Sequence, residues 1–124
     1  MEFNNIAILI FEAAPEFKEF YKEDLGEEYY NSFLGEFALF TRDAIVNQET
    51  YALKYLYFIN DTVNRFYNDK DFINKMIINV LEILTDYEVT QSASREYFNG
   101  YCLVLFDELF TSGQFINLLT LPKW

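Results

Sequence analysis

Carboxylates are the only abundant side chains in this sequence that could perform acid–base chemistry. The chain contains no histidine, so it lacks the commonest general base and metal ligand and the usual activator of a nucleophile. Its one cysteine, Cys102, lies in the apolar run YCLVLF and is expected to be buried and unreactive. Glycosidase-like catalysis would need a pair of acids, but no spacing selects one from Glu36, Asp43, Glu82, Asp107 and Glu108. We therefore predict a protein that is not an enzyme, with no catalytic residues, no cofactor and no metal site.

The densest group of carboxylates is the segment EDLGEEYY, residues 23–30. It places Glu23, Asp24, Glu27 and Glu28 within six residues. A calcium loop is disfavoured, because these acids lack the DxDxDG spacing that makes ligands converge. Carboxylates this close together attract the arginine and lysine side chains of a protein partner. A solvated helix end followed by a turn would give the same pattern, so both interpretations remain open.

Tyrosine provides further candidates for a protein contact. The chain has 10 tyrosines and 14 phenylalanines, too many for every tyrosine to be buried behind one apolar stripe per helix. A tyrosine beside a carboxylate offers a large contact area with a polar tip, whereas half-buried packing at helix edges is the competing interpretation. The predicted partner-binding residues form a first region of Glu23, Asp24, Glu27, Glu28, Tyr29 and Tyr30, and a second of Glu82, Asp86, Glu88, Glu96 and Tyr97.

The overall charge limits the class of partner. The 124 residues include 20 acidic and 9 basic side chains, which gives a net charge of −11 and a pI near 4.2. Such a field repels nucleic acids and anionic membrane surfaces and attracts cationic proteins. The N-terminal residues lack the positive charge and long apolar core of a secretory signal, and no stretch approaches the roughly 20 apolar residues that span a bilayer. We expect a cytoplasmic protein that binds neither nucleic acid nor a membrane.

Helices are the elements that must position these residues. Apolar residues recur at helical spacing almost throughout, alternation of the strand type is scarce, and the chain has only four glycines and two prolines. We predict an all-α fold, one domain over residues 1–124 with five to six helices. Antiparallel helical hairpins would form either a bundle or a short HEAT-like stack. The expected helices cover residues 5–13, 15–26, 29–46, 51–67, 72–87 and 94–110.

The second of these helices carries four large apolar residues at helical spacing. Phe17, Phe20, Tyr21 and Leu25 stand at i, i+3, i+4 and i+8, which places them on one face. We expect all four to be buried together.

Helix ends and turns give a further set of expectations. Thr50 and Asp71 are placed to cap the helices that follow them. Gly35 is expected to allow a close helix crossing. The segment 88–94 is expected to be a loop, and the tail 111–124 to be irregular chain.

Three stretches of the sequence are similar to a family of small bacterial helical proteins. They are FEAAPEFKEFYKEDLGE (11–27), EFALFTRDAI (36–45) and LKYLYFINDTVNRFYNDKDFINKMIINVLEIL (53–84). In that family an FPEF-like start, written APEF here, precedes a helix, and an Asn/Asp-rich turn joins a helical pair. A small, acidic, histidine-free helical protein also resembles a bacterial immunity protein of a contact-dependent growth inhibition or polymorphic toxin system.

The resemblance implies a stoichiometric inhibitor of a cognate toxin. Toxin domains of this kind are commonly basic nucleases, and an immunity protein blocks the active site or an adjacent surface. The family supplies no functional residue that can be carried over to this sequence. The alternative, from another class, is a non-catalytic helical scaffold or adaptor that binds a peptide in a solenoid-like groove.

Overall fold

The computed structural model describes residues 1–111, with side chains up to Leu109, and the regular elements of this part of the chain are all helices, with no strand. The all-α prediction is therefore confirmed. The predicted irregular tail lies outside the described residues from 112 onward. The seven α-helices of the described part are α1 (Phe3–Ala13), α2 (Pro15–Phe20), α3 (Tyr30–Val46), α4 (Ala52–Arg65), α5 (Lys70–Met76), α6 (Glu88–Tyr97) and α7 (Gly100–Thr111). Shorter helical turns are Glu27–Tyr29 and Ile83–Thr85, both 3₁₀, and Ile77–Leu81, which is π-helical.

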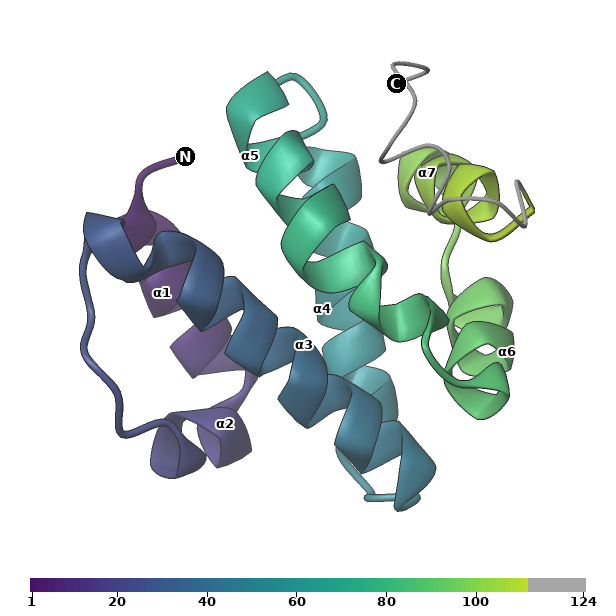
Figure 1. Ribbon diagram of the computed structural model, residues 1–124, viewed down its shortest axis with the longest axis horizontal. Helices are drawn as coiled ribbons and strands as arrows, with labels where there is room; N and C mark the ends of the chain where they lie inside the picture. The colour runs from purple at the N-terminus through teal and green to yellow at the C-terminus, as the bar shows by residue number, and fades with distance from the viewer. Residues whose placement is uncertain (112–124) are drawn as a thin grey trace.

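Helix α3 occupies the centre of the molecule. It contacts α4, α5 and α6 as well as the π turn that continues α5. Figure 1 shows α1 and α2 at one end of the long axis and α6 and α7 at the other, with α3 and α4 between them. The long helices α3 and α4 therefore connect two small groups of short helices.

Phe17 is the most connected ring of the core beside α2. Its centroid lies 5.7 Å from Phe33, 5.3 Å from Phe37 and 5.6 Å from Phe40, each edge-to-face. Tyr21 contributes a further ring at 5.4 Å. Edge-to-face packing of this kind adds to the free energy of burial, so Phe17 fixes α2 on α3.

The apolar faces that the sequence predicts for the two long helices are confirmed except at one position. On α3 the predicted face is buried throughout, at Tyr30, Phe33, Leu34, Phe37, Thr41, Ala44 and Ile45. On α4 the predicted face is buried at Ala52, Leu56, Ile59 and Val63, whereas its last member, Phe66, is half-buried. Cys102 is also buried, and burial raises the pKa of its thiol to about 12.

The prediction for residues 15–26 is wrong beyond Phe20. Helix α2 ends there, because Tyr21 adopts extended backbone dihedrals (φ −78°, ψ 115°) and turns its ring into the core. Phe17 and Tyr21 are buried as expected, but Phe20 is 57% exposed and Leu25 is 53% exposed. The predicted single helix is thus a short helix followed by a non-helical segment. Phe20 at the end of the helix and Leu25 in the segment are exposed to solvent.

The predicted caps are also corrected. Asp69, not Asp71, is the N-cap of α5, the helix after the Asn/Asp-rich turn. Its Oδ1 accepts a hydrogen bond from Phe72 N at 3.1 Å. Tyr51 rather than Thr50 precedes α4, without a side-chain cap. A Cβ at Gly35 would meet no atom within 4 Å, so this glycine does not mark a close crossing.

Residues 88–94, predicted to be a loop, form most of α6. The sequence shows no helical spacing of large apolar residues here, because the buried face of α6 consists of small hydroxyl residues, Thr90 and Ser94. The last helix begins at Gly100 instead of Ser94. Four residues of the predicted final helix, 94–97, therefore belong to α6, and Phe98 and Asn99 connect the two helices.

Side-chain amides explain the break before α7. Asn60 Oδ1 accepts from Asn99 N and Asn64 Oδ1 accepts from Cys102 N, both at 2.9 Å. These bonds satisfy amide groups that a helix N-terminus leaves without intrahelical partners. Gly100 has φ +58°, and a Cβ there would lie 3.2 Å from Asn64 Oδ1. Helix α4 therefore supplies the cap of α7.

Phe17 and Phe20 were predicted to lie on the same buried face, and alanine substitutions should show that only Phe17 belongs to the core. We expect Phe17→Ala to lower the free energy of unfolding by about 3–5 kcal/mol, because a buried ring and its aromatic contacts are lost. Phe20→Ala is the matched control and should cost less than about 1 kcal/mol, since the ring is mostly exposed. Urea unfolding followed by circular dichroism measures both, and equal losses would contradict the packing described here.

Candidate protein-binding surface

The first predicted region lies mostly in residues 20–29, which run from the last residue of α2 to the start of α3 and which we name the acidic strap. Figure 1 shows the chain running along one edge of the molecule here, beside α1. Four acids of the strap are exposed, Glu23, Asp24, Glu27 and Glu28, and its one exposed cation is Lys22. The strap therefore presents a net negative charge to solvent.

Apolar side chains are exposed on the same segment. Phe20 and Leu25 are more than half exposed, and Tyr29 is 37% exposed. Scattered surface apolar residues need no explanation, but three within ten residues, rimmed by acids, resemble the mixture of anchors and charges found at protein interfaces.

Tyr21 fixes the beginning of the strap. Its ring packs edge-to-face on Phe33 at 5.2 Å, and its hydroxyl donates a hydrogen bond to the carbonyl of Asp24 at 3.1 Å. Burial, with the charges of Glu23 and other nearby acids, raises the pKa of Tyr21 above its ordinary value. The hydroxyl therefore remains a donor at neutral pH and closes the turn that exposes Glu23 and Asp24.

Glu27 and Tyr30 fix the other end. Glu27 Oε1 accepts a hydrogen bond from Phe3 N at 2.8 Å, so this carboxylate caps the N-terminus of α1 from a distant part of the chain. Tyr30 is buried, and its hydroxyl donates to the carbonyl of Met1 at 2.7 Å. Both residues were predicted to contact a partner. The structure gives each of them a contact within the fold, and it buries Tyr30 but leaves Glu27 exposed.

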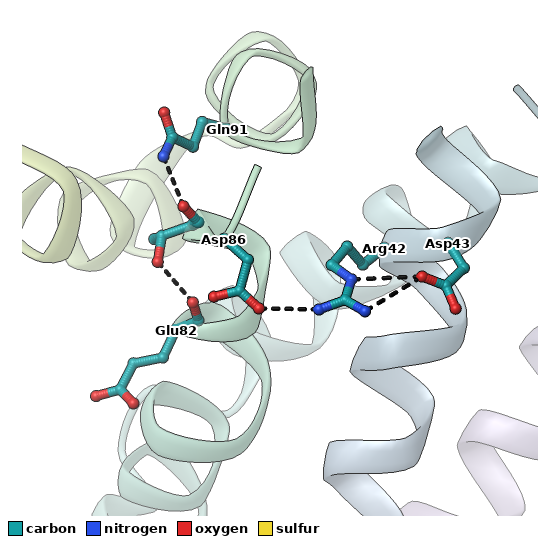
Figure 2. Close-up of polar contacts among 6 residues, drawn as sticks. Arg42, Asp43, Glu82, Asp86 and Gln91 are labelled. Atoms are coloured by element: carbon teal, nitrogen blue, oxygen red, sulfur yellow. Dashed lines mark hydrogen bonds and ion pairs between the residues drawn. The ribbon is translucent and has the colours of Figure 1, made fainter. Parts of the chain in front are cut away.

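The second predicted region includes an acid already paired within the chain. Asp86 Oδ2 accepts a hydrogen bond from Arg42 Nη1 at 2.9 Å, and Arg42 also contacts Asp43 at 3.3 Å (Figure 2). The guanidinium lies 4.9 Å from the centre of the Tyr87 ring. Asp86 therefore ties α3 to the segment before α6, and its charge is largely compensated.

Glu82 lies in an environment that disfavours its charge. In Figure 2 its side chain points away from Arg42. Its Oε1 is buried and has no hydrogen-bond partner among the described residues. Burial, and secondarily the charge of Asp86, raises the pKa of this carboxyl above its ordinary value.

The other members of the second region reach the surface separately. Glu88 and Glu96 are exposed at the two ends of α6. Tyr97 is half-buried and packs edge-to-face on the exposed Tyr57 of α4, with centroids 5.5 Å apart. These residues do not join the acidic strap, because α6 and the strap lie at opposite ends of the long axis in Figure 1.

The comparisons with known proteins return no relative for this chain: no family model, curated protein or solved structure matches it. Within the described residues, no group of three or more histidine, cysteine, aspartate or glutamate side chains could hold a metal ion. None of the described helices is both long and apolar enough to cross a membrane.

Phe20 and Leu25 are the surface residues that the sequence analysis missed. Their helical spacing with Phe17 predicted burial, and that signal was misleading. The composition of the segment gave a better indication, because Leu25 stands between Asp24 and Gly26 in a run with four acids. A run this acidic cannot enter a core without counter-charges.

The cap on α1 can be tested by removing one carboxylate at a time from the strap. We expect Glu27→Ala to lower the free energy of unfolding by about 1 kcal/mol, the usual cost of losing a helix N-cap. Glu28→Ala, the matched control, should change it by less than about 0.5 kcal/mol, because Glu28 is equally exposed but the hydrogen bond to Phe3 N comes from Glu27. Equal effects in urea unfolding would show that Glu27 does not cap α1.

The environment of Glu82 predicts a pH-dependent effect of removing its charge. Because its pKa is raised in the folded protein, the fold favours the protonated form and the carboxylate is destabilising at neutral pH. Glu82→Gln should therefore stabilise the protein at pH 7, by up to about 1 kcal/mol. The gain should disappear as the pH falls below the ordinary glutamate pKa of 4.5. Glu88→Gln, the matched control at an exposed position, should change the free energy of unfolding at pH 7 by less than about 0.5 kcal/mol. A gain from Glu82→Gln that persists at low pH would contradict this account.

Proposed function

We propose that this protein is an immunity protein that binds and neutralises a cognate basic toxin domain, with nucleases the favoured class. It would do so by covering the active site or an adjacent surface of the toxin. The observation that carries the proposal is the acidic strap. Its exposed acids Glu23, Asp24 and Glu28 alternate with exposed apolar side chains, and the segment is held at both ends by buried tyrosines.

Electrostatics supports rapid capture of a cationic partner. Opposite fields raise association rate constants toward about 10⁸–10⁹ M⁻¹s⁻¹ at low salt. The net charge of −11 provides such a field over the whole protein. A toxin that acts on the nucleic acid of its own cell must be captured before it reaches that substrate, so the proposal includes action in the bacterial cytoplasm.

The apolar residues of the strap support slow dissociation. Aromatic and aliphatic anchors at the centre of an interface account for most of its binding energy, and affinity differences arise mainly in the dissociation rate. Because Tyr21 and Tyr30 hold the strap in place, little conformational entropy is lost when a partner binds. The strap thus combines steering charges with preorganised anchors.

A second function, the peptide-binding adaptor, is favoured by one observation. A mostly apolar depression of about 460 Å³ lies between α1 and the end of α4, and Ile8 is exposed at its edge. Exposed apolar depressions of this kind bind short amphipathic segments. The residues that line it are Met1, Asn5, Ile8, Leu9, Phe66 and Asp69.

The direct test is to produce this protein together with the toxin domain encoded immediately upstream of it. We expect cells with the wild-type chain to survive and cells without it to die. The triple variant Glu23→Gln, Asp24→Asn, Glu28→Gln should bind the purified toxin domain about tenfold more slowly at low salt, with a weaker salt dependence.

Two controls make the result specific. Glu88→Gln with Glu96→Gln removes charge at the opposite end of the molecule and should change the association rate much less. Ile8→Asp alters the depression beside α1 and should leave neutralisation intact. If cells die equally fast with and without the wild-type chain, the inhibitor proposal is wrong. If Ile8→Asp alone abolishes protection, the partner uses the depression and not the strap.

A further inference from the structure

A second concave surface adjoins the acidic strap. It is a cleft of about 340 Å³ between the end of α2, the C-terminal half of α3 and the turn that leads into α4. This volume lies at the small end of the range of ligand pockets, about 300–1,000 Å³. Phe20, the first residue of the strap, forms part of its wall.

Three aromatic rings line the cleft in a continuous series. The Phe20 centroid lies 4.9 Å from Phe40, and the Phe40 centroid lies 6.0 Å from Tyr51. Phe40 and Tyr51 are nearly parallel, with 16° between their planes. Aromatic faces attract cations, and a flat guanidinium is better suited than an ammonium group to lie along them.

Three carboxylates, Glu36, Asp43 and Glu49, surround the same rings. Asp43 and Glu49 are exposed and Glu36 is half-buried. Within the described part of the chain, neither Glu36 nor Glu49 forms an ion pair. Glu49 already interacts with the Tyr51 side chain through a hydrogen bond. Because a carboxylate has about four acceptor positions, both groups can still accept hydrogen bonds from a cationic guest, and arginine can pair with a carboxylate through two parallel bonds.

The cation among the described lining residues, Arg42, pairs with one of these carboxylates, Asp43, at 3.3 Å. Figure 2 shows that its guanidinium also reaches across to Asp86, at 2.9 Å. The same group lies over the ring of Tyr87. The charge of Arg42 is thus shared between Asp43 and Asp86, and it compensates neither Glu36 nor Glu49. The cleft retains aromatic walls and an excess of negative charge.

We propose that this cleft receives a single arginine side chain from the protein partner, with the guanidinium along the rings of Phe20, Phe40 and Tyr51 and its N–H groups on Glu36 and Glu49. The inference rests on the proposed function for the source of the side chain, because a basic toxin domain would provide it. The chemistry of the site depends only on the cleft. Its position next to the strap lets one bound partner occupy both.

The test uses the full chain, labelled with ¹⁵N, and three capped tripeptides at constant ionic strength. The peptides are Gly-Arg-Gly, its Lys analogue, and its citrulline analogue, which keeps the shape of arginine without the charge. We expect the arginine peptide to cause saturable shifts of the Phe40, Asn47 and Tyr51 amide signals. Citrulline should bind at least about tenfold more weakly and lysine about threefold more weakly.

Variants then assign the effect to the cleft. Phe20→Ala and Glu49→Gln should each weaken binding of the arginine peptide by about threefold or more. Glu12→Gln removes an exposed acid from α1 and should leave binding unchanged. Equal binding of arginine and citrulline, equal binding of arginine and lysine, or shifts spread over the acidic surface would each overturn the inference.

The peptide-binding experiment and the toxin experiment test the two proposals separately. Protection of cells by the wild-type chain without saturable binding of the arginine peptide leaves the immunity proposal standing and overturns the arginine cleft. Saturable arginine binding without protection supports the cleft and shows that its partner is not a toxin.

Discussion

The fold depends most on the contacts that the Phe17 ring makes with the aromatic residues of α3. Phe33, Phe37 and Phe40 meet this ring from three successive turns of one helix, so α2 can be only as long as its alignment with α3 permits. After Phe20 the chain must leave the core, and Tyr21 makes that exit in an extended conformation. The exposed segment that follows is therefore a consequence of aromatic packing, and its acids are displayed because the core has no room for them.

The carboxylates of the strap divide into two kinds with different physical roles. Glu27 is held by the backbone of α1 and contributes to folding, whereas Glu23, Asp24 and Glu28 face solvent and contribute to the field. The same division applies to the second acidic region, where Asp86 is paired with Arg42 and Glu88 is exposed. A dense acidic run in a sequence thus overestimates the charge available to a partner, because helix ends and arginines inside the fold use part of it.

The sequence was sufficient to predict the fold class and the buried faces of α3 and α4, where large apolar residues recur without interruption. It failed where small or polar residues decide the structure. Helix α6 buries Thr90 and Ser94, which carry no hydrophobic signal, and the break before α7 depends on Asn60 and Asn64, 35 or more residues away in sequence. The acids of the strap could be predicted from composition. The aromatic cleft could not, because Phe40 lies on α3 and Tyr51 lies directly before α4, and no local pattern specifies the relative position of these two elements.

The amide network between α4 and α7 also affects how the chain ages. Asn99 is followed by Gly100, the one Asn-Gly pair in the sequence, and such a pair deamidates readily when the backbone nitrogen of the flexible glycine can reach the side-chain carbonyl carbon. Here the Asn99 carboxamide oxygen accepts hydrogen bonds from Asn60 Nδ2 and Asn64 Nδ2, both at 3.2 Å. These two bonds hold the Asn99 carboxamide in one orientation, so cyclisation onto the Gly100 nitrogen competes with them in the folded protein. Conversion to aspartate would place a carboxylate against the same two amide donors. Chemical damage at this position should accumulate mainly in molecules that have already lost the contact between α4 and α7.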